Sequence, residues 1–294
     1  MYRRFCLLFL IFIFISFSVS CVAPIAFDAT GAEFGIMEVF VFGFENADAI
    51  LITTDNHTVM IDTGEEQHGS EIVAHLNRNG ITSIDYLIIT HFDRDHVGGA
   101  AEVIQTIEVQ EVVVPHYLRE SRHYLRFVQA MQESGIHPIV LTSSTRLEFM
   151  LDGVMFTTYA SDLDFYEYII SEDYSHLPNV NNFSLVTTIN HGNNHFLFTG
   201  DAMARRLREI LSTESIMTNN FDFLKVPHHG RYNRRSIEFI NRIRPRYAAI
   251  TCSFDRPAAA EVVEALEAVG SEIFFVKNGS VLIRSDGNKL IVSQ

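Results

Sequence analysis

The stretch THFDRDHVGG, residues 90–99, decides how this chain is interpreted. It follows the apolar run 84–89, which is typical of a buried strand that ends in a turn. Four potential metal ligands lie close together here: His91, Asp93, Asp95 and His96. In a loop, the first two can face one point while the other two face a neighbouring point. Imidazole and carboxylate ligands together favour zinc, with manganese or iron as the less favoured metals.

Four further motifs follow in the order of a known family. They are VMIDTG at 59–64, NNFSLV at 181–186, FLFTGD at 196–201 and LKVPHHG at 224–230. With the first motif, they resemble the metallo-β-lactamase superfamily over roughly residues 36–293. Aspartate at the second ligand position resembles the hydrolase domain of ComEC-type competence proteins and the related secreted phosphorylcholine esterases.

The resemblance implies an α/β fold, the four-layer αββα metallo-β-lactamase sandwich. Alternating apolar strands and helical stretches from residue 36 onward support one such domain. The pattern predicts helices near 69–78, 97–107, 117–134, 202–213, 233–243 and 258–269. It predicts strands near 36–43, 48–53, 58–62, 84–89, 110–114, 138–141, 153–159, 184–190, 195–199, 222–226 and 246–251.

Asp201 resembles the family's carboxylate that bridges two metals. Two dications about 3.5–4 Å apart repel each other, and a shared carboxylate offsets that repulsion. The alternative is an N-cap for the helix near 202–213. Of His228 and His229, one is expected to complete the second metal's ligands beside Asp95 and His96. The sequence favours His228, and leaves the other histidine to pack, to hydrogen bond to a ligand or to face substrate.

The other metal would be held by His91, Asp93 and the shared Asp201. This set leaves open positions for water or a substrate oxygen, as a catalytic metal requires. Two zinc ions are expected, with manganese as the alternative, and a metal-bound water with its pKa lowered to about 7 would supply a hydroxide nucleophile. Asp95 could both bind metal and orient that hydroxide, whereas Asp62 is interpreted as a brace for the metal loop.

Three departures from the family pattern concern the substrate side. The usual VGQGD reads FGFENAD at 42–48, no Gly-His-Thr type segment is found, and Arg256 stands where a His-Pro is usual. Arg256 could grip a phosphate through two hydrogen bonds or could mark an altered site. Asn181 and Ser184 either line the pocket or form a turn before a strand. Arg231, close to the histidine pair, is a candidate contact for an anionic substrate.

The N-terminus has the pattern of an export signal. Residues 1–20 combine a charged start with a short apolar run and small residues before Cys21, which resembles a bacterial lipobox. We therefore expect a signal peptide over 1–20, a tether over 21–35 and a hydrolase domain over 36–294. Lipidation of Cys21 would anchor the protein outside the cytoplasmic membrane. Cleavage with release, or an uncleaved anchor, are the alternatives.

The net charge of −14 argues against nucleic acid as the main partner, because that affinity depends on cationic contacts. One local basic group, formed by Arg205, Arg206 and Arg208, is interpreted as a solvated helix face. The sequence as a whole predicts an extracytoplasmic zinc hydrolase acting on phosphoesters, a phosphodiesterase or nuclease-like enzyme. The alternatives are a lactone, thioester or β-lactam hydrolase, and a lipid-anchored metal-binding protein without activity.

Overall fold

A computed structural model describes residues 34–163, 179–218 and 220–294. The signal peptide, Cys21 and its proposed lipidation lie outside the described residues. Among the described residues, no helix has the length and apolar character needed to cross a membrane.

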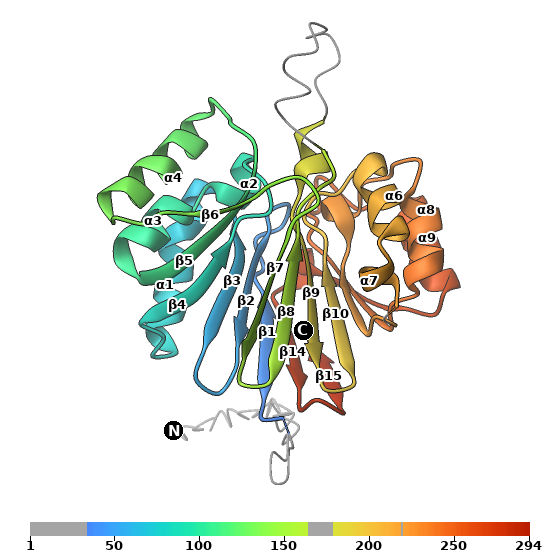
Figure 1. Cartoon of the computed structure of the whole chain (residues 1–294). Helices are drawn as coiled ribbons and strands as arrows, with labels where there is room; N and C mark the ends of the chain where they lie inside the picture. The colour runs from blue at the N-terminus through green and yellow to red at the C-terminus, as the bar shows by residue number, and fades with distance from the viewer. Residues whose placement is uncertain (1–33, 164–178, 219) are drawn as a thin grey trace, which may run out of the picture.

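Two β-sheets form the centre of the fold (Figure 1). The first has eight strands in the order β15-β14-β1-β2-β3-β4-β5-β6, and the second has seven in the order β13-β12-β11-β10-β9-β8-β7. The first sheet contains β1 (Met37–Val41), β2 (Ala49–Thr53), β3 (Thr58–Thr63), β4 (Ser83–Ile88), β5 (Glu108–Pro115), β6 (Ile139–Leu141), β14 (Val281–Ser285) and β15 (Leu290–Ser293). The second contains β7 (Arg146–Leu151), β8 (Val154–Tyr159), β9 (Val186–His191), β10 (Asn194–Phe198), β11 (Phe223–Lys225), β12 (Tyr247–Ile250) and β13 (Glu272–Phe275).

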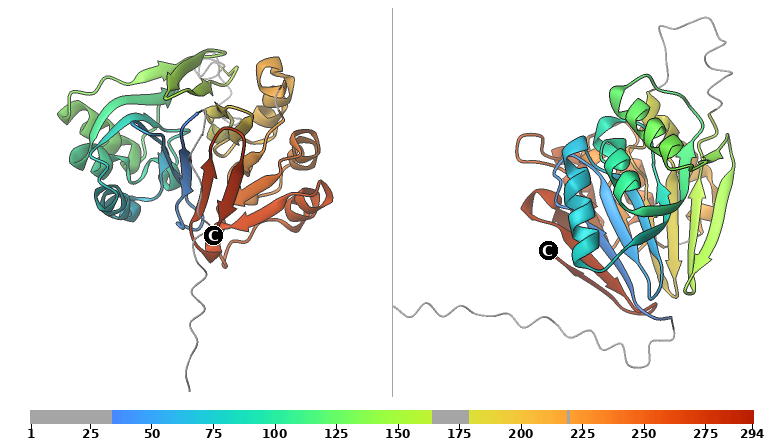
Figure 2. Two further views of the ribbon diagram at one scale, coloured as in Figure 1. Left: turned by 90° about the horizontal axis from the view of Figure 1, so that it is seen from below. Right: turned by 90° about the vertical axis from the view of Figure 1, so that its left-hand side faces the viewer.

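Helices cover the outer face of each sheet, which confirms the predicted αββα order (Figures 1 and 2). On the first sheet lie α1 (Gly69–Arg78), α2 (Arg94–Val97), α3 (Ala100–Thr106) and α4 (Arg122–Glu133). On the second lie α6 (Ala204–Ser212), α7 (Glu214–Met217), α8 (Ser236–Ile243) and α9 (Ala260–Ala268). Short 3₁₀ turns occupy Glu66–His68, Val180–Phe183, Pro227–Gly230 and Val276–Asn278.

The sheets hold together because their strands are apolar on the faces that meet. Ile61 and Ile88 of the first sheet lie in one buried cluster with Phe156, Phe196 and Phe223 of the second. Burying such side chains stabilises the fold by about 1.5–3 kcal/mol each relative to exposure. Separate apolar clusters lie between each sheet and its helices. The sandwich is therefore rigid behind the loops that carry the site.

The predicted helix over 97–107 is interrupted at its start. α2 ends at Val97, Gly98 and Gly99 follow it, and the helix over most of the predicted range is α3. A Cβ on Gly99 would come within 2.4 Å of the Thr63 carbonyl oxygen, and one on Gly98 within 2.6 Å of the Glu66 nitrogen. The two glycines thus let the metal loop pack directly against the end of β3.

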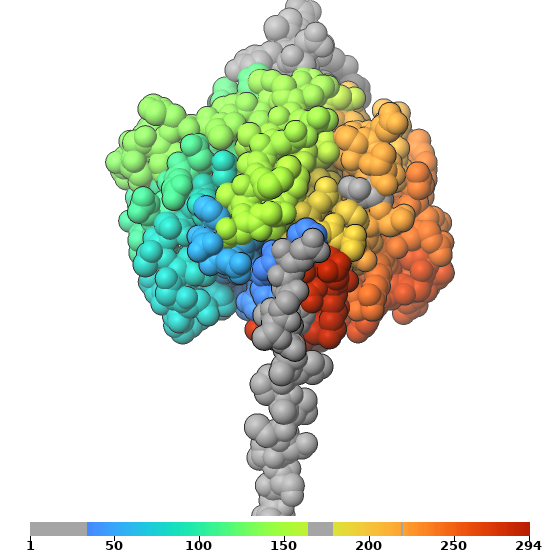
Figure 3. All heavy atoms as spheres, turned by 60° about the horizontal axis from the view of Figure 1, so that its bottom comes forward, coloured from blue at the N-terminus to red at the C-terminus, as the bar shows by residue number. Residues whose placement is uncertain are grey.

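Four strands were not predicted: β7, β13, β14 and β15. The side chains of β7 alternate between exposed and half-buried, so its sequence RLEFML does not read as a buried strand. β14 is antiparallel to β1, with Met37 opposite Ser285, and this pairing joins distant parts of the chain. Figure 3 shows the blue β1 region beside the red C-terminal strands.

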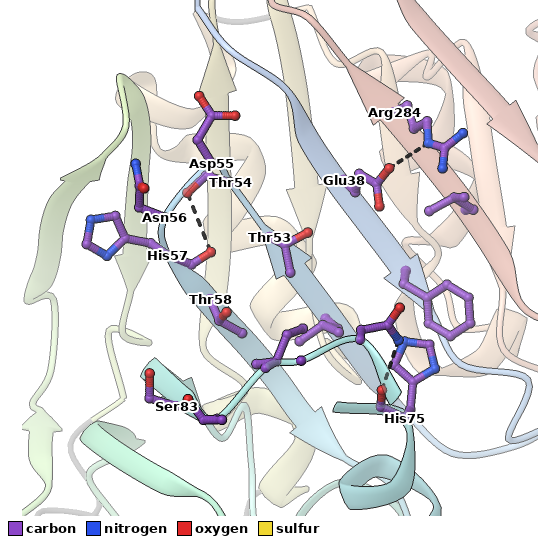
Figure 4. A pocket seen from close by; sticks show the side chains of 17 residues that line it. Glu38, Thr53, Thr54, Asp55, Asn56, His57, Thr58, His75, Ser83 and Arg284 are labelled. Carbon is purple, nitrogen blue, oxygen red and sulfur yellow. Dashed lines mark hydrogen bonds and ion pairs between the residues drawn. The ribbon is translucent and has the colours of Figure 1, made fainter. Parts of the chain in front are cut away.

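The loops that carry the site lie at one end of the sandwich, where β4, β10, β11 and β12 end. A groove of about 630 Å³ lies near the other end of the first sheet, beside α1 (Figure 4). Its lining mixes hydroxyl and amide groups with charged and apolar side chains, and its labelled ion pair joins Glu38 to Arg284 at 2.6 Å. The groove is therefore remote from the predicted ligands.

Candidate metal centre

Side chains from two other segments of the chain, the metal loop at 91–96 and the turn that carries His229, converge on Asp201 directly after β10. The Nε2 atom of His96 lies 3.3 Å from Asp201 Oδ1, and that of His229 lies 3.2 Å from Oδ2. His229 Nε2 is also 3.5 Å from Asp95 Oδ2. Asp95, His96, Asp201 and His229 each offer one ligand atom within 4.8 Å of the others. This group has the size and the donor atoms of a divalent metal site.

A second group of predicted ligands lies beside the same carboxylate. His91 Nε2 is 4.0 Å from Asp201 Oδ2 and 3.7 Å from Asp93 Oδ2. Asp201 therefore faces both predicted ligand sets, as a bridging carboxylate must. It is not a helix cap: Met203 occupies the N-cap position of α6, and no side chain caps that helix.

Asp62 fixes two of the histidines through Thr90. Its carboxylate accepts hydrogen bonds from the Thr90 nitrogen at 2.7 Å, the Thr90 hydroxyl at 2.6 Å and His96 Nδ1 at 2.7 Å. The Thr90 oxygen also lies 3.1 Å from His91 Nδ1, from which it can accept a hydrogen bond. Because both Nδ1 atoms are engaged, both Nε2 atoms are left to face Asp201. These contacts are those expected of a brace for the metal loop, and the choice between brace and ligand stays a prediction.

Asp48 fixes the ring of His229 in a similar way, through the hydroxyl of Thr251. The Thr251 hydroxyl donates to Asp48 Oδ1 at 2.7 Å and lies 3.0 Å from His229 Nδ1. The other Asp48 oxygen forms a buried ion pair with Lys225, whose Nζ is 3.8 Å from Asp201 Oδ1. Sequence reasoning missed these three residues. The available signal was a polar residue at the end of, or inside, an apolar strand.

Burial and neighbouring charges set the protonation of the cluster. Burial lowers the pKa of His91 well below its ordinary value. Burial opposes the charging of His96 and His229, but Asp201 and the other carboxylates raise the pKa of His96 well above normal and that of His229 to about 9. Burial likewise opposes ionisation of Asp201, yet His229 and His96 hold its pKa well below normal. Positive charge at the centre is thus already favoured.

The residues present fit a bound metal. The Nε2 atoms of His91, His96 and His229 are buried and make no well-directed hydrogen bond in the described part of the chain, and the same holds for Asp201 Oδ1. Buried polar atoms normally have a partner, because leaving one unsatisfied costs about 1–3 kcal/mol. Divalent cations held by the two groups of residues would give all four atoms a partner.

His228 and His229 lie differently from the sequence-based preference. Both have left-handed backbones, with φ of 50° and 54°, so successive rings point in different directions. His229 lies with Asp95 and His96, the place for which the sequence favoured His228. His228 Nε2 instead lies 3.8 Å from Asp201 Oδ2 and 3.5 Å from Asn181 Nδ2. The assignment of His228 to that set is corrected by this geometry, while binding of a metal by either histidine stays a prediction.

Of the four predicted substrate residues, Asn181 and Ser184 lie close to Asp201 and the histidine pair, whereas Arg231 and Arg256 lie on the surface. Asn181 lies in the 3₁₀ turn before β9, and its side chain is beside that of His228. It therefore belongs both to a turn and to the site. Ser184 is fully buried and its hydroxyl accepts from the Asp201 nitrogen at 3.3 Å, which holds the carboxylate instead of facing solvent. Arg231 and Arg256 are exposed. Arg256 lies beside the 43–46 loop rather than among the ligands.

One arginine that the sequence did not single out contacts a predicted ligand. Arg119 lies in the loop between β5 and α4, and its Nη2 atom is 2.7 Å from Asp93 Oδ1. The other Asp93 oxygen faces His91. The Asp93 carboxylate therefore has one oxygen engaged with a cation and one directed to the centre.

Comparisons with known proteins agree with this geometry. The profile of the metallo-beta-lactamase superfamily matches residues 42–252. The chain belongs to this superfamily. Its members are in general metal-dependent hydrolases, so a hydrolase with a divalent-metal site is the class to which this chain is assigned.

Two curated proteins resemble the chain over most of its length. One is ComE operon protein 3 of Bacillus subtilis, 28% identical over 66% of this chain and 25% of that protein. The other is Recombination protein 2 of Haemophilus influenzae, 26% identical over 69% of this chain and 22% of that protein. The chain thus spans about a quarter of each relative, and the resemblance to ComEC-type proteins predicted from the motifs is confirmed.

Solved structures support the fold. The metallo-beta-lactamase fold protein YhfI from Bacillus subtilis superposes with a TM-score of 0.56 at 10% identity, covering 85% of this chain and 100% of that one. A metal-dependent hydrolase of the beta-lactamase superfamily gives 0.53 at 12% identity, covering 83% and 98%. At such identities the likeness concerns the fold alone.

Proposed function

We propose that this protein is a phosphodiesterase of the metallo-β-lactamase superfamily that holds two divalent metals, zinc in the first instance. The observation that carries the proposal is the set of three buried histidine Nε2 atoms around Asp201, each fixed through its Nδ1. One metal would be held by Asp95, His96 and His229, the other by His91 and Asp93, with Asp201 shared. When bound, such metals supply Lewis acidity and an activated water for in-line displacement at phosphorus.

The chain's own residues supply the remaining parts. Hydrolysis would form a P–O bond to a water oxygen and break the P–O bond to the leaving alcohol, which needs a proton. His228 is placed to take up the proton that the attacking water releases and to pass it to the leaving oxygen, because its Nε2 is close to Asp201 while 14% of its side chain is open to solvent. Burial lowers its pKa against the attraction of Asp201, with Arg231 adding to the effect. Arg231 and Asn181 would orient the anionic substrate.

A phosphodiester is preferred over a lactone, thioester or β-lactam for two reasons. The segment that brings a third histidine to the first metal in true β-lactamases is missing from the sequence, and one of the two curated relatives is named Recombination protein 2. Action outside the cytoplasmic membrane, with Cys21 as a lipid anchor, is part of the proposal and rests on the leader pattern. The global charge of −14 favours envelope phosphodiesters over long nucleic acids.

The test combines metal content with turnover. We expect about two metals per chain by mass spectrometry and hydrolysis of bis(p-nitrophenyl) phosphate, with both lost in Asp201→Ala. Asp222→Ala is the matched control, because Asp222 lies at the other end of the neighbouring strand, where it accepts from the His195 nitrogen. A protein with at most one metal and no turnover after metal loading would favour the alternative of a non-catalytic metal-binding or interaction protein. Rapid turnover of nitrocefin or a lactone instead would replace the phosphodiester by an acyl substrate.

A further inference from the structure

A basic pocket lies outside the metal centre, at the same end of the second sheet. Its volume is about 370 Å³, and four arginines line it against two carboxylates, Asp162 and Glu209. The arginines are Arg146 at the start of β7 and Arg205, Arg206 and Arg208 of α6. In a chain of net charge −14, a recess with an excess of arginine is suited to an anion.

The arginines of the pocket have different roles. Arg206, expected to be solvated, is 1% exposed; it forms an ion pair with Glu209 and donates to the carbonyl oxygens of Ser184 at 3.0 Å and Tyr159 at 2.9 Å. That side chain is structural and forms the floor. Arg205 is exposed and only 3.7 Å from Asp162 across a solvated pair. Such an exposed ion pair contributes little to stability, so Arg205 can leave Asp162 and bind a ligand instead.

Arg208 is the strongest candidate for ligand contact. It is exposed, lines the pocket and has no carboxylate partner in the described part of the chain. Arg208 follows Arg205 by about one turn of α6, so both side chains lie on the same face of the helix and line the pocket. Arg205 and Arg208 are thus exposed, and Arg206 is buried beneath them. The two carboxylates of the pocket do not fully neutralise the positive charge of its arginines, which makes the pocket a candidate anion site.

The pocket is joined to the metal centre through Ser184. Arg206 binds the carbonyl of Ser184, and the hydroxyl of Ser184 accepts from the Asp201 nitrogen. The strand ends between the two sites run β10, β9, β8, β7, with Phe198 opposite Thr187 and Tyr159 opposite Arg146. Three strand spacings correspond to about 14 Å, or roughly two to three units of an extended phosphodiester chain.

From this placement we infer that the pocket formed by Arg205, Arg206 and Arg208 with Arg146 is a distal subsite that binds a second phosphate of the same substrate chain. The inference rests on the proposed phosphodiesterase function and makes the substrate an oligomer rather than a single phosphodiester. A short single-stranded nucleic acid and a glycerol-phosphate polymer both carry phosphodiester groups in sequence, so both serve as probes.

The test compares long and short substrates in a double variant, Arg205→Gln with Arg208→Gln. The matched control is Arg78→Gln with Arg242→Gln, which removes the same charge from exposed positions on α1 and α8 outside the pocket. We expect the ratio of kcat/KM on a twelve-residue oligodeoxynucleotide or a glycerol-phosphate hexamer to kcat/KM on bis(p-nitrophenyl) phosphate to fall roughly tenfold in the pocket variant. The control should leave the ratio unchanged. A fall with one oligomer only supports the site and identifies its source.

Binding separates this inference from the proposed function. Fluorescence anisotropy of the labelled oligomers is measured on Asp201→Ala with and without the pocket substitutions. We expect affinity to drop roughly tenfold and the salt dependence to weaken by about one counterion per arginine. Absence of all hydrolysis refutes the phosphodiesterase and leaves this binding measurement decisive. Equal binding in the pocket variant, or an equal loss in the control pair, overturns the subsite.

Discussion

Replacing Asp62 by asparagine removes one charge from a carboxylate that contacts the metal loop three times. Asparagine can still accept from the Thr90 nitrogen or hydroxyl, but its amide cannot serve both Thr90 and His96 as the carboxylate does. His96 then loses the acceptor that fixes its Nδ1 proton and its ring orientation. We expect Asp62→Asn to keep both metals bound but to weaken binding.

The size of the effect follows from the role of Asp62. Partners that orient a metal ligand usually contribute about 10–100-fold in metal affinity, or about 1.4–2.7 kcal/mol. Loss of a ligand itself, as in Asp201→Ala, should cost far more. Asp48, Asp62 and His96 also offer ligand atoms within 4.8 Å of one another, so a role for Asp62 as a direct ligand is the competing explanation.

The assay is competition for zinc between the protein and a chromophoric chelator, with the variant's fold checked by circular dichroism. Asp85→Asn is the matched control. Asp85 also accepts from a backbone nitrogen and from a histidine, Thr58 and His57 at 2.8 Å each, but near the other end of the sheet. Zinc affinity equal to that of the wild type in a folded Asp62→Asn protein would refute the bracing argument. Complete loss of one metal would make Asp62 a ligand.

The remaining predictions concern the histidines and their supports. His229→Ala should remove a metal, whereas His228→Ala should keep the metal content and lower kcat on bis(p-nitrophenyl) phosphate by about 10²–10⁴-fold if it transfers a proton; equal metal loss in both would contradict the assignment. Thr251→Val, which keeps the shape but breaks the link from Asp48 to His229, should lower zinc affinity about tenfold, and unchanged affinity in the chelator competition would show the link to be dispensable. The pKa of His229 is raised from 6.5 to about 9 in the folded protein, so its contribution, about 3 kcal/mol, is fully present below pH 6.5 and is lost as the pH rises through 9. Urea unfolding of the metal-free protein should therefore show stability falling between pH 6.5 and 10, and this fall should be smaller in His229→Gln.

The fold and the meeting of the predicted ligand residues at one place were largely predictable, because short motifs resemble those of a known family. The motif at 90–99, the apolar runs and the residues after them lie within short windows, so the sequence indicated the ends of β4, β10 and β11. Metal binding by these residues stays a prediction. The choice between His228 and His229 could not be made from the spacing of the motif, since it depends on the left-handed backbone of both residues. Asp48, Lys225 and Thr251 escaped prediction for a related reason. Their partners lie in other strands, and a buried ion pair is recognised only when both members are brought together.

The antiparallel pairing of β1 with β14 sets the order in which the first sheet can be completed. More than two hundred residues separate the paired strands, so β1 emerges during synthesis long before its outer neighbour. At roughly 5–20 residues per second, that delay is on the order of ten seconds or more. The exposed edge of β1 is a template for wrong pairing throughout that time. The first sheet is therefore complete only after β14, one of the last strands to be synthesised, has paired with β1 and β15 has paired with β14.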